Sequence, residues 1–207
     1  MASRIATIAE LRTLYREPGK LVESKLKTSL DEGSRRFIER CPFVLVGTLG
    51  EDGRLDVSPR GGPPGFLRVL SDGSIAIPDL NGNNLIDSLR AIVETGSVGM
   101  LFVHPGRDET LRVNGSAYVT VDPEVLSGFT TDLRLPKSAV VVEPREVFVH
   151  CAKAFRRAQL WDPESWTFAD APDAASILQC QLDLPDGALE QLRDSLDKSY
   201  VEGLAAD

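Results

Sequence analysis

Apolar residues recur at helical spacing in the first forty residues of the chain. Four of them are spaced three residues apart: Ile5, Ile8, Leu11 and Leu14. A Pro-Gly pair at residues 18 and 19 ends this pattern, and further helices are predicted over residues 20–30 and 31–40. The Cys-Pro pair that follows stops the third helix, because the residue before a proline avoids the helical region. We therefore expect residues 1–40 to form a helical segment that packs on the rest of the protein.

From residue 43 the pattern becomes typical of β-strands. Short runs of apolar and β-branched residues alternate with turns rich in Gly, Pro, Asn and Asp. Strands are predicted over residues 43–49, 55–58, 66–70, 74–78, 97–104, 109–121 and 140–150. The segment 59–65 contains three prolines and three glycines, so we expect it to be an irregular loop.

One helix is predicted between the strands, over residues 81–94, and it follows an Asn-rich loop. Shorter helices are expected over residues 123–132 and 151–160, and an amphipathic helix over residues 185–204. Sequential antiparallel strands with one crossing helix, and with helices at both termini, favour a mainly β, α+β fold. The expected architecture is an antiparallel split or closed β-barrel.

Composition narrows the possible partners. The 207 residues include 31 acidic and 23 basic side chains, a net charge of −8, which argues against nucleic acid as a partner. No apolar run reaches the roughly 18–20 residues of a membrane span, and no membrane partner is expected. The chain begins without the apolar segment of a signal peptide, and its three cysteines are far apart, which favours a cytoplasmic protein.

Nucleophilic and metal chemistry find little support in the sequence. Only two histidines are present, His104 and His150, so no metal site is expected. His150 and Cys151 are adjacent on a predicted strand and would point to opposite faces, which makes them a poor catalytic pair. A buried structural thiol is the expected role of a free cysteine here. Neither a Gly-x-Gly-x-x-Gly motif nor a Walker A loop occurs.

Three polar stretches could bind an anion. Residues 56–65 carry Arg60 in a glycine-rich setting, residues 78–87 place Asn side chains before a helix, and residues 106–115 place Arg112 inside a strand. Each also has a plain structural explanation: a solvated arginine, an Asn cap and turn, or an outward arginine on a half-solvated sheet.

Taken together, these stretches resemble the FMN-binding split-barrel proteins related to pyridoxamine 5′-phosphate oxidase, in their uncharacterised branch. The carrying motifs are residues 56–61 (Asp-Val-Ser-Pro-Arg-Gly), 79–84 (Asp-Leu-Asn-Gly-Asn-Asn), 109–115 (Glu-Thr-Leu-Arg-Val-Asn-Gly) and 150–161. The resemblance covers about residues 37–161. It implies a split-barrel flavin-binding core over residues 41–161. Residues 162–207 would be an extension with a terminal helix, within a single domain overall.

The resemblance also implies a homodimer with one FMN in each of two clefts at the subunit interface. The cofactor-binding residues that it implies are Ser58, Pro59, Arg60, Asn83, Asn84, Thr110, Arg112, Lys153, Arg156, Arg157 and Trp161. The first three match a segment that contacts the flavin ring and places an arginine near its phosphate. Asn83 and Asn84 stand where the oxidases carry basic phosphate ligands. Thr110 and Arg112 match the strand across the cleft, and the last four match a basic segment that closes it.

The implied function is that of a flavin-dependent oxidoreductase that exchanges a hydride at flavin N5 with a small molecule. Its substrate and electron donor stay open, and the sequence shows no catalytic residue. The alternatives are a haem-binding relative that uses His104 or His150 as axial ligand, or a deazaflavin-binding relative. A non-enzymatic flavin-binding or stress protein is a further alternative. The last alternative is a barrel that has lost its cofactor site, which the neutral side chains of Asn83 and Asn84 would favour.

Overall fold

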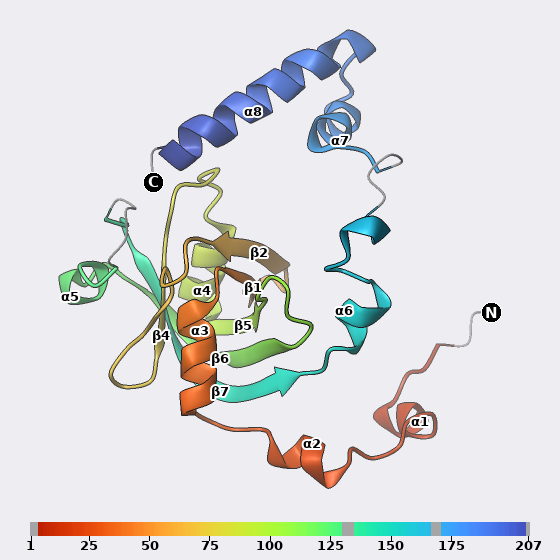
Figure 1. Ribbon diagram of the computed structural model, residues 1–207, viewed down its shortest axis with the longest axis vertical. Helices are drawn as coiled ribbons and strands as arrows, with labels where there is room; N and C mark the ends of the chain where they lie inside the picture. The colour runs from red at the N-terminus through yellow and green to blue at the C-terminus, as the bar shows by residue number, and fades with distance from the viewer. Residues whose placement is uncertain (1–3, 130–134, 167–170, 206–207) are drawn as a thin grey trace.

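The fold is a seven-stranded sheet in which every neighbouring pair of strands is antiparallel, in the order β2-β1-β5-β6-β7-β4-β3. The computed structural model describes residues 4–129, 135–166 and 171–205. The strands are β1 (Phe43–Leu49), β2 (Leu55–Gly61), β3 (Arg68–Val69), β4 (Ile75–Pro78), β5 (Ser97–Phe102), β6 (Thr110–Thr120) and β7 (Ala139–His150). The sheet curls into a half-open barrel (Figure 1). The expected antiparallel split barrel of the α+β class is therefore confirmed.

Helices lie between the strands and at both ends of the chain. They are α1 (Ile8–Arg12), α2 (Lys20–Ser24), α3 (Glu32–Arg40), α4 (Asp87–Thr95), α5 (Pro123–Leu126), α6 (Lys153–Arg157), α7 (Ala174–Gln181) and α8 (Leu189–Ala205), with 3₁₀ turns η1 (Pro163–Ser165) and η2 (Asp186–Ala188). The expected helix over residues 123–132 is only one turn long, and its residues from 130 lie outside the described residues. Of the expected N-terminal helical segment, α3 buries Ile38 in the barrel, whereas α1 and α2 bury no residue.

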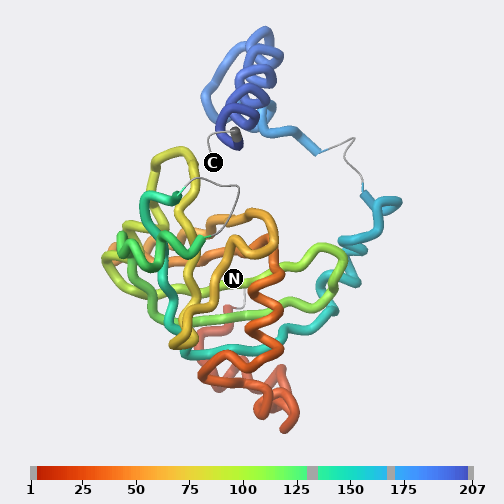
Figure 2. The backbone as a smooth tube through the Cα atoms, turned by 60° about the vertical axis from the view of Figure 1, so that its left-hand side comes forward, coloured from red at the N-terminus to blue at the C-terminus, as the bar shows by residue number. Residues whose placement is uncertain are grey.

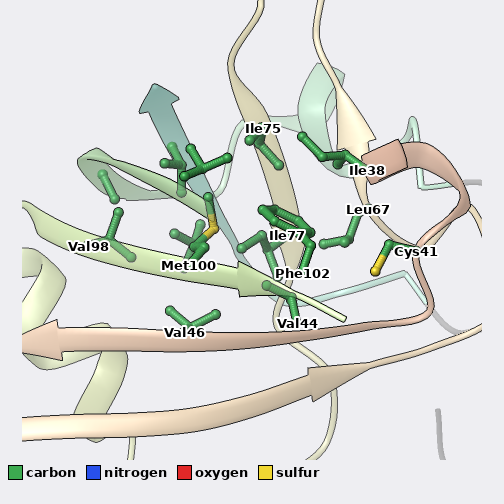
Figure 3. Packing of buried hydrophobic residues seen from close by; sticks show 14 of the residues in the cluster. Ile38, Cys41, Val44, Val46, Leu67, Ile75, Ile77, Val98, Met100 and Phe102 are labelled. Carbon is green, nitrogen blue, oxygen red and sulfur yellow. The ribbon is translucent and has the colours of Figure 1, made fainter. Parts of the chain in front are cut away.

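The core lies on the concave face of the sheet, because burial alternates along its strands. In β1, Val44 and Val46 are buried, whereas Leu45 and Gly47, which alternate with them, are only half-buried on the opposite face. The buried cluster joins Ile38 from α3 to Met100 and Phe102 from β5 (Figure 3). Phe102 is completely buried, so it is one of the residues on which stability depends most.

Strand β2 extends further than the sequence predicts. The segment from residue 59 was expected to be a loop, but β2 continues to Gly61 and pairs with β1 throughout. This is possible because β2 is an edge strand, and an edge position tolerates the missing N–H of Pro59. Arg60 therefore sits on a strand, and its side chain has a defined face.

The helix predicted over residues 81–94 begins late, at Asp87. Asn83 accepts a hydrogen bond from the backbone N–H of Leu85, at 3.0 Å, and so forms a turn instead of a helix cap. Asn84 and Ile86 both have positive φ, 59° and 53°, which keeps this segment out of the helix. The N-cap of α4 is Ile86, which has no side-chain hydrogen bond to the first turn. The backbone amides of that turn are thus left without a side-chain cap.

Helices α7 and α8 form a hairpin that stands apart from the barrel (Figure 2). Asp173 caps α7 by accepting a hydrogen bond from the backbone N–H of Ser176, at 2.8 Å, and binds Arg193 of α8, also at 2.8 Å. The hydrogen bonds from Ser176, followed by Arg193, lower the pKa of Asp173 to about 2. Because this pKa is depressed, the cap is at full strength above the ordinary value near 3.8 and is lost only as the pH falls through about 2.

The three cysteines should differ sharply in reactivity. Cys41 is fully buried, and burial raises the pKa of its thiol, whereas Cys151 and Cys180 are exposed. Titration of the native protein with a thiol-reactive chromophore should therefore label Cys151 and Cys180 rapidly. Cys41 should react only after denaturant is added. Rapid labelling of all three thiols in the folded protein would contradict the burial of Cys41.

Candidate functional site

A polar cavity of about 200 Å³ lies between the edge strand β2 and the loop that leads into α4. Its lining comes from β2 (Asp56, Ser58, Arg60), from the loop (Asp79, Leu80, Gly82, Asn83, Asn84, Leu85, Ile86) and from the first turn of α4 (Asp87, Ser88, Leu89). Alternation along β2 points residues 56, 58 and 60 to the same side. The structure thus brings together four of the predicted residues: Ser58, Arg60, Asn83 and Asn84.

Arg60 is the single cation in the lining of the polar cavity. Its Nη2 donates a long hydrogen bond of 3.4 Å to the hydroxyl of Ser88, which in turn donates to Asp56 Oδ2 at 2.6 Å. Within the described part of the chain, Arg60 forms no ion pair. Asp56 belongs to the motif of residues 56–61 but is not among the predicted site residues, although the strand period of β2 places it beside Ser58, and the sequence analysis missed Ser88.

The polar cavity also carries three carboxylates, from Asp56, Asp79 and Asp87. Two of them have partners. Asp56 accepts a hydrogen bond from the Ser88 hydroxyl, and Asp87 Oδ1 lies 3.8 Å from Arg90 Nη2. The Arg60 guanidinium lies beside the first turn of α4, through its hydrogen bond to Ser88, and a guanidinium next to uncapped helix amides suits an anionic group. The carboxylates of Asp56 and Asp87 lie at the same turn and suit hydroxyl donors of a ligand.

An apolar groove of about 460 Å³ lies on the convex face of the sheet. Its lining is Leu45, Gly47, Val57, Gly99, Met100, Leu101, Thr110, Arg112, Asn114, His150, Cys151, Ala154 and Phe155, and we call it the outer groove. A hollow of about 520 Å³ adjoins it and shares Gly47, Val57, Gly99 and Asn114. Asp56 lines both this hollow and the polar cavity, so the two faces meet at β2.

Strand register divides the predicted site residues between these two faces. Arg112 pairs with Leu101, Leu101 with Leu45, and Leu45 with Pro59, so all four side chains share the convex face. Ser58 and Arg60 flank Pro59 and point the other way. Within one chain, the side chains of Arg60 and Arg112 therefore point to opposite faces of the sheet.

Arg112 is already engaged on the convex face. Its guanidinium carbon lies 4.1 Å from the centroid of the Phe148 ring, and its Nη2 lies 3.3 Å from Glu146. Asn114 donates to the same Glu146 oxygen at 2.7 Å. Glu146 partly neutralises Arg112, which leaves this arginine less able than Arg60 to bind an anion.

The predicted site residues in and after α6, Lys153, Arg156, Arg157 and Trp161, line neither the polar cavity nor the outer groove. Arg156 is paired with Asp108 at 2.9 Å, and Arg157 donates to the backbone carbonyl of Lys153 at 3.2 Å. Trp161 donates to the backbone carbonyl of Arg107 at 2.8 Å. Its ring lies 5.9 Å from that of Phe155, which does line the groove.

The two histidines have different surroundings. His104 is packed edge-on against Phe37, with ring centroids 6.0 Å apart. His150 is exposed at the rim of the outer groove, with its ring 6.1 Å from that of Phe148. Within the described residues, no cluster of three or more His, Cys, Asp or Glu could hold a metal ion. None of the described helices is both long and apolar enough to cross a membrane.

Comparison with known proteins gives a family match for the region that forms the barrel. The family model described as pyridoxamine 5′-phosphate oxidase matches residues 30–151. No curated protein matches the sequence as a relative. Among solved structures, HupZ from Group A Streptococcus is 14% identical, with 58% of this chain and 93% of that chain covered and a TM-score of 0.48. The heme storage protein HutZ from Vibrio cholerae is 11% identical, with 59% and 94% covered and a TM-score of 0.42.

These structural likenesses are too distant to carry an argument about ligands. The sequence match stands on its own, since it spans more than half of the chain. It includes all seven strands, β1 to β7, and ends just before helix α6. The chain belongs to the pyridoxamine 5′-phosphate oxidase family.

Proposed function

We propose that the protein binds FMN with the phosphate in the polar cavity, and that it is a flavin-dependent oxidoreductase acting on a small molecule. The observation that carries this proposal is Arg60, a guanidinium without an ion pair among the described residues, beside the uncapped N-terminus of α4. A guanidinium fork and helix amides are the donors that phosphate oxygens prefer.

The donors of the polar cavity fit a phosphate at one end. Arg60 would supply charge-assisted hydrogen bonds, each worth about 1.5–3 kcal/mol. The first-turn amides of α4 and the amide groups of Asn83 and Asn84 would add neutral donors. Asp56 and Asp79 would accept hydrogen bonds from ribityl hydroxyls instead of facing the phosphate. The polar cavity would therefore offer donors to the phosphate of FMN and acceptors to its hydroxyl groups.

The convex face would provide the apolar surface that a flavin ring needs. When bound, FMN supplies a ring that exchanges a hydride with the substrate. The walls of the hollow next to β2 are mainly apolar or glycine, so they would exclude water from the ring. Leu55 and Val57 are 80% and 67% exposed there, and we propose that a second copy of the chain covers them in a homodimer. Thr110 and Arg112 of that second copy would then complete the cleft.

Purification without added cofactor tests the proposal. We expect a flavin absorption spectrum, release of FMN on denaturation and a dimeric mass by light scattering. A colourless protein that fails to bind added FMN would rule the flavin out and leave deazaflavin as the next ligand to add. A monomer that still holds FMN would contradict the shared cleft. The three free cysteines favour a reducing compartment, and we propose that the protein acts in the cytoplasm.

A haem protein is the second candidate, because His150 stands exposed at an apolar groove. In that case the purified protein would show a Soret band, and His150→Ala would remove it. His104→Ala is the matched control, because His104 packs against Phe37 away from the groove. A flavin spectrum that is unchanged in both variants would exclude this candidate.

A further inference from the structure

The negative charge of the chain is concentrated at its C-terminal end. Residues 162–207 contain eleven acidic and two basic side chains, a net charge of −9. The first 161 residues contain 20 acidic and 21 basic side chains, a net charge of +1. Within this region, the hairpin of α7 and α8 with its capping Asp173 (residues 173–205) contains seven acidic and two basic side chains, a net charge of −5, and we call it the acidic hairpin.

The acidic hairpin leaves part of its apolar surface uncovered. Helix α7 has 8 residues and α8 has 17, so α7 is about 12 Å long and α8 about 25 Å. Leu192 and Leu196 are half-buried near α7, but the next turns of α8 are open. Tyr200, Val201 and Leu204 lie on adjoining positions of one face and are 56%, 70% and 76% exposed. These three side chains therefore form a solvent-exposed apolar face that is available to a partner.

The N-terminal end of the chain carries a net positive charge and exposed apolar side chains, which complement the acidic hairpin. Residues 4–27, which we call the N-terminal arm, contain six basic and three acidic side chains. Its helices α1 and α2 have five residues each and bury none, although helices this short are unstable without packing. Ile8, Leu14 and Leu21 are 73%, 66% and 81% exposed.

We propose that the acidic hairpin of one copy docks on the N-terminal arm of a second copy. Opposite net charges steer the two segments together, and exposed apolar side chains on each would be buried by the contact. Within one chain the two segments lie on opposite sides of the barrel (Figures 1 and 2). The barrel therefore separates them, and a second copy is the occupant. This contact does not depend on FMN, because no residue of either segment lines the polar cavity, the hollow or the outer groove.

Crosslinking between copies tests the docking. Cys151 and Cys180 are first replaced by serine, and the buried Cys41 is kept. One full-length chain then carries Leu14→Cys and another carries Val201→Cys, and the two are mixed and treated with a short thiol crosslinker. We expect a crosslinked pair that contains one chain of each kind. Val93→Cys is the matched control for Val201→Cys, because Val93 on α4 is 73% exposed but lies outside both segments.

Charge reversal makes the test specific. Asp194→Lys with Asp197→Lys should lower the yield of the mixed crosslink by about tenfold, and Arg16→Glu with Lys20→Glu on the other chain should restore it. Circular dichroism confirms that each variant is folded. The absence of a crosslink in the mixture would overturn the proposal. A crosslink yield that is equal with the control position would overturn it as well.

Discussion

Arg60→Glu is expected to weaken FMN binding by about a hundredfold or more. The substitution removes the charge-assisted hydrogen bonds of the guanidinium, worth about 1.5–3 kcal/mol each, and adds a fourth carboxylate to the lining of the polar cavity. The new carboxylate would repel the phosphate at the position where the guanidinium attracts it in the parent protein. Titration with FMN, followed by quenching of flavin fluorescence, measures the change.

Arg54→Glu is the matched control for this substitution. Arg54 precedes β2 in the same hairpin and has the same charge, but it does not line the polar cavity. It should leave the affinity within about twofold, because an exposed charge outside the site is screened by water and salt. Equal affinities of the parent and the Arg60→Glu variant would place the phosphate elsewhere. Equal losses in both variants would show a general charge effect instead of a site.

The strands were predictable because their burial follows the period of the sheet. In β1 and β5 every second residue is buried, and the boundary predicted for β1 is the one observed. The sequence could not show that β2 runs on to Gly61, because its tolerance of Pro59 depends on its place at the sheet edge. The late start of α4 likewise depends on left-handed residues, and Ile86 gives no local signal for that conformation.

Part of the predicted set of site residues lies together in the structure, but the sequence does not show their arrangement. The resemblance placed Ser58, Arg60, Asn83 and Asn84 together, and they line one cavity. It did not show that Arg112 faces the other side of the sheet, since that follows from the register of four strands. Ser88 joins Arg60 to Asp56 only because α4 packs beside β2.

The division between two faces gives the proposed dimer a physical reason. Arg60 and Arg112 of one chain point to opposite faces of the sheet, so their guanidinium groups cannot bind the same group of a ligand. The apolar lining of the convex face is open, with Leu55 and Val57 largely exposed. A second copy placed there would cover these side chains and bring its own Arg112 to the cleft. The proposed flavin site is therefore incomplete in a single chain.

Phe102→Ala is expected to lower the free energy of unfolding by about 3–5 kcal/mol, because it empties a fully buried site at the centre of the barrel core. Its neighbours in the core come from β1, β4 and α3, so the cavity cannot collapse by moving one element (Figure 3). For a chain of this size the loss corresponds to a fall in Tm of about 6–20 °C. Urea denaturation followed by circular dichroism measures it at fixed protein concentration, because a dimer's stability depends on concentration.

Tyr118→Ala provides the comparison, because Tyr118 is an aromatic residue of the same sheet but is 49% exposed. Removing this side chain should lower the free energy of unfolding by at most about 1 kcal/mol, since a half-exposed side chain leaves no closed cavity. If both substitutions lower the free energy of unfolding equally, Phe102 does not lie in the core and the sheet is not curved around it. If only Phe102→Ala unfolds at a lower urea concentration, the concave face is the part of the barrel that stabilises the fold. The convex face would then be free to serve the ligand and the second copy.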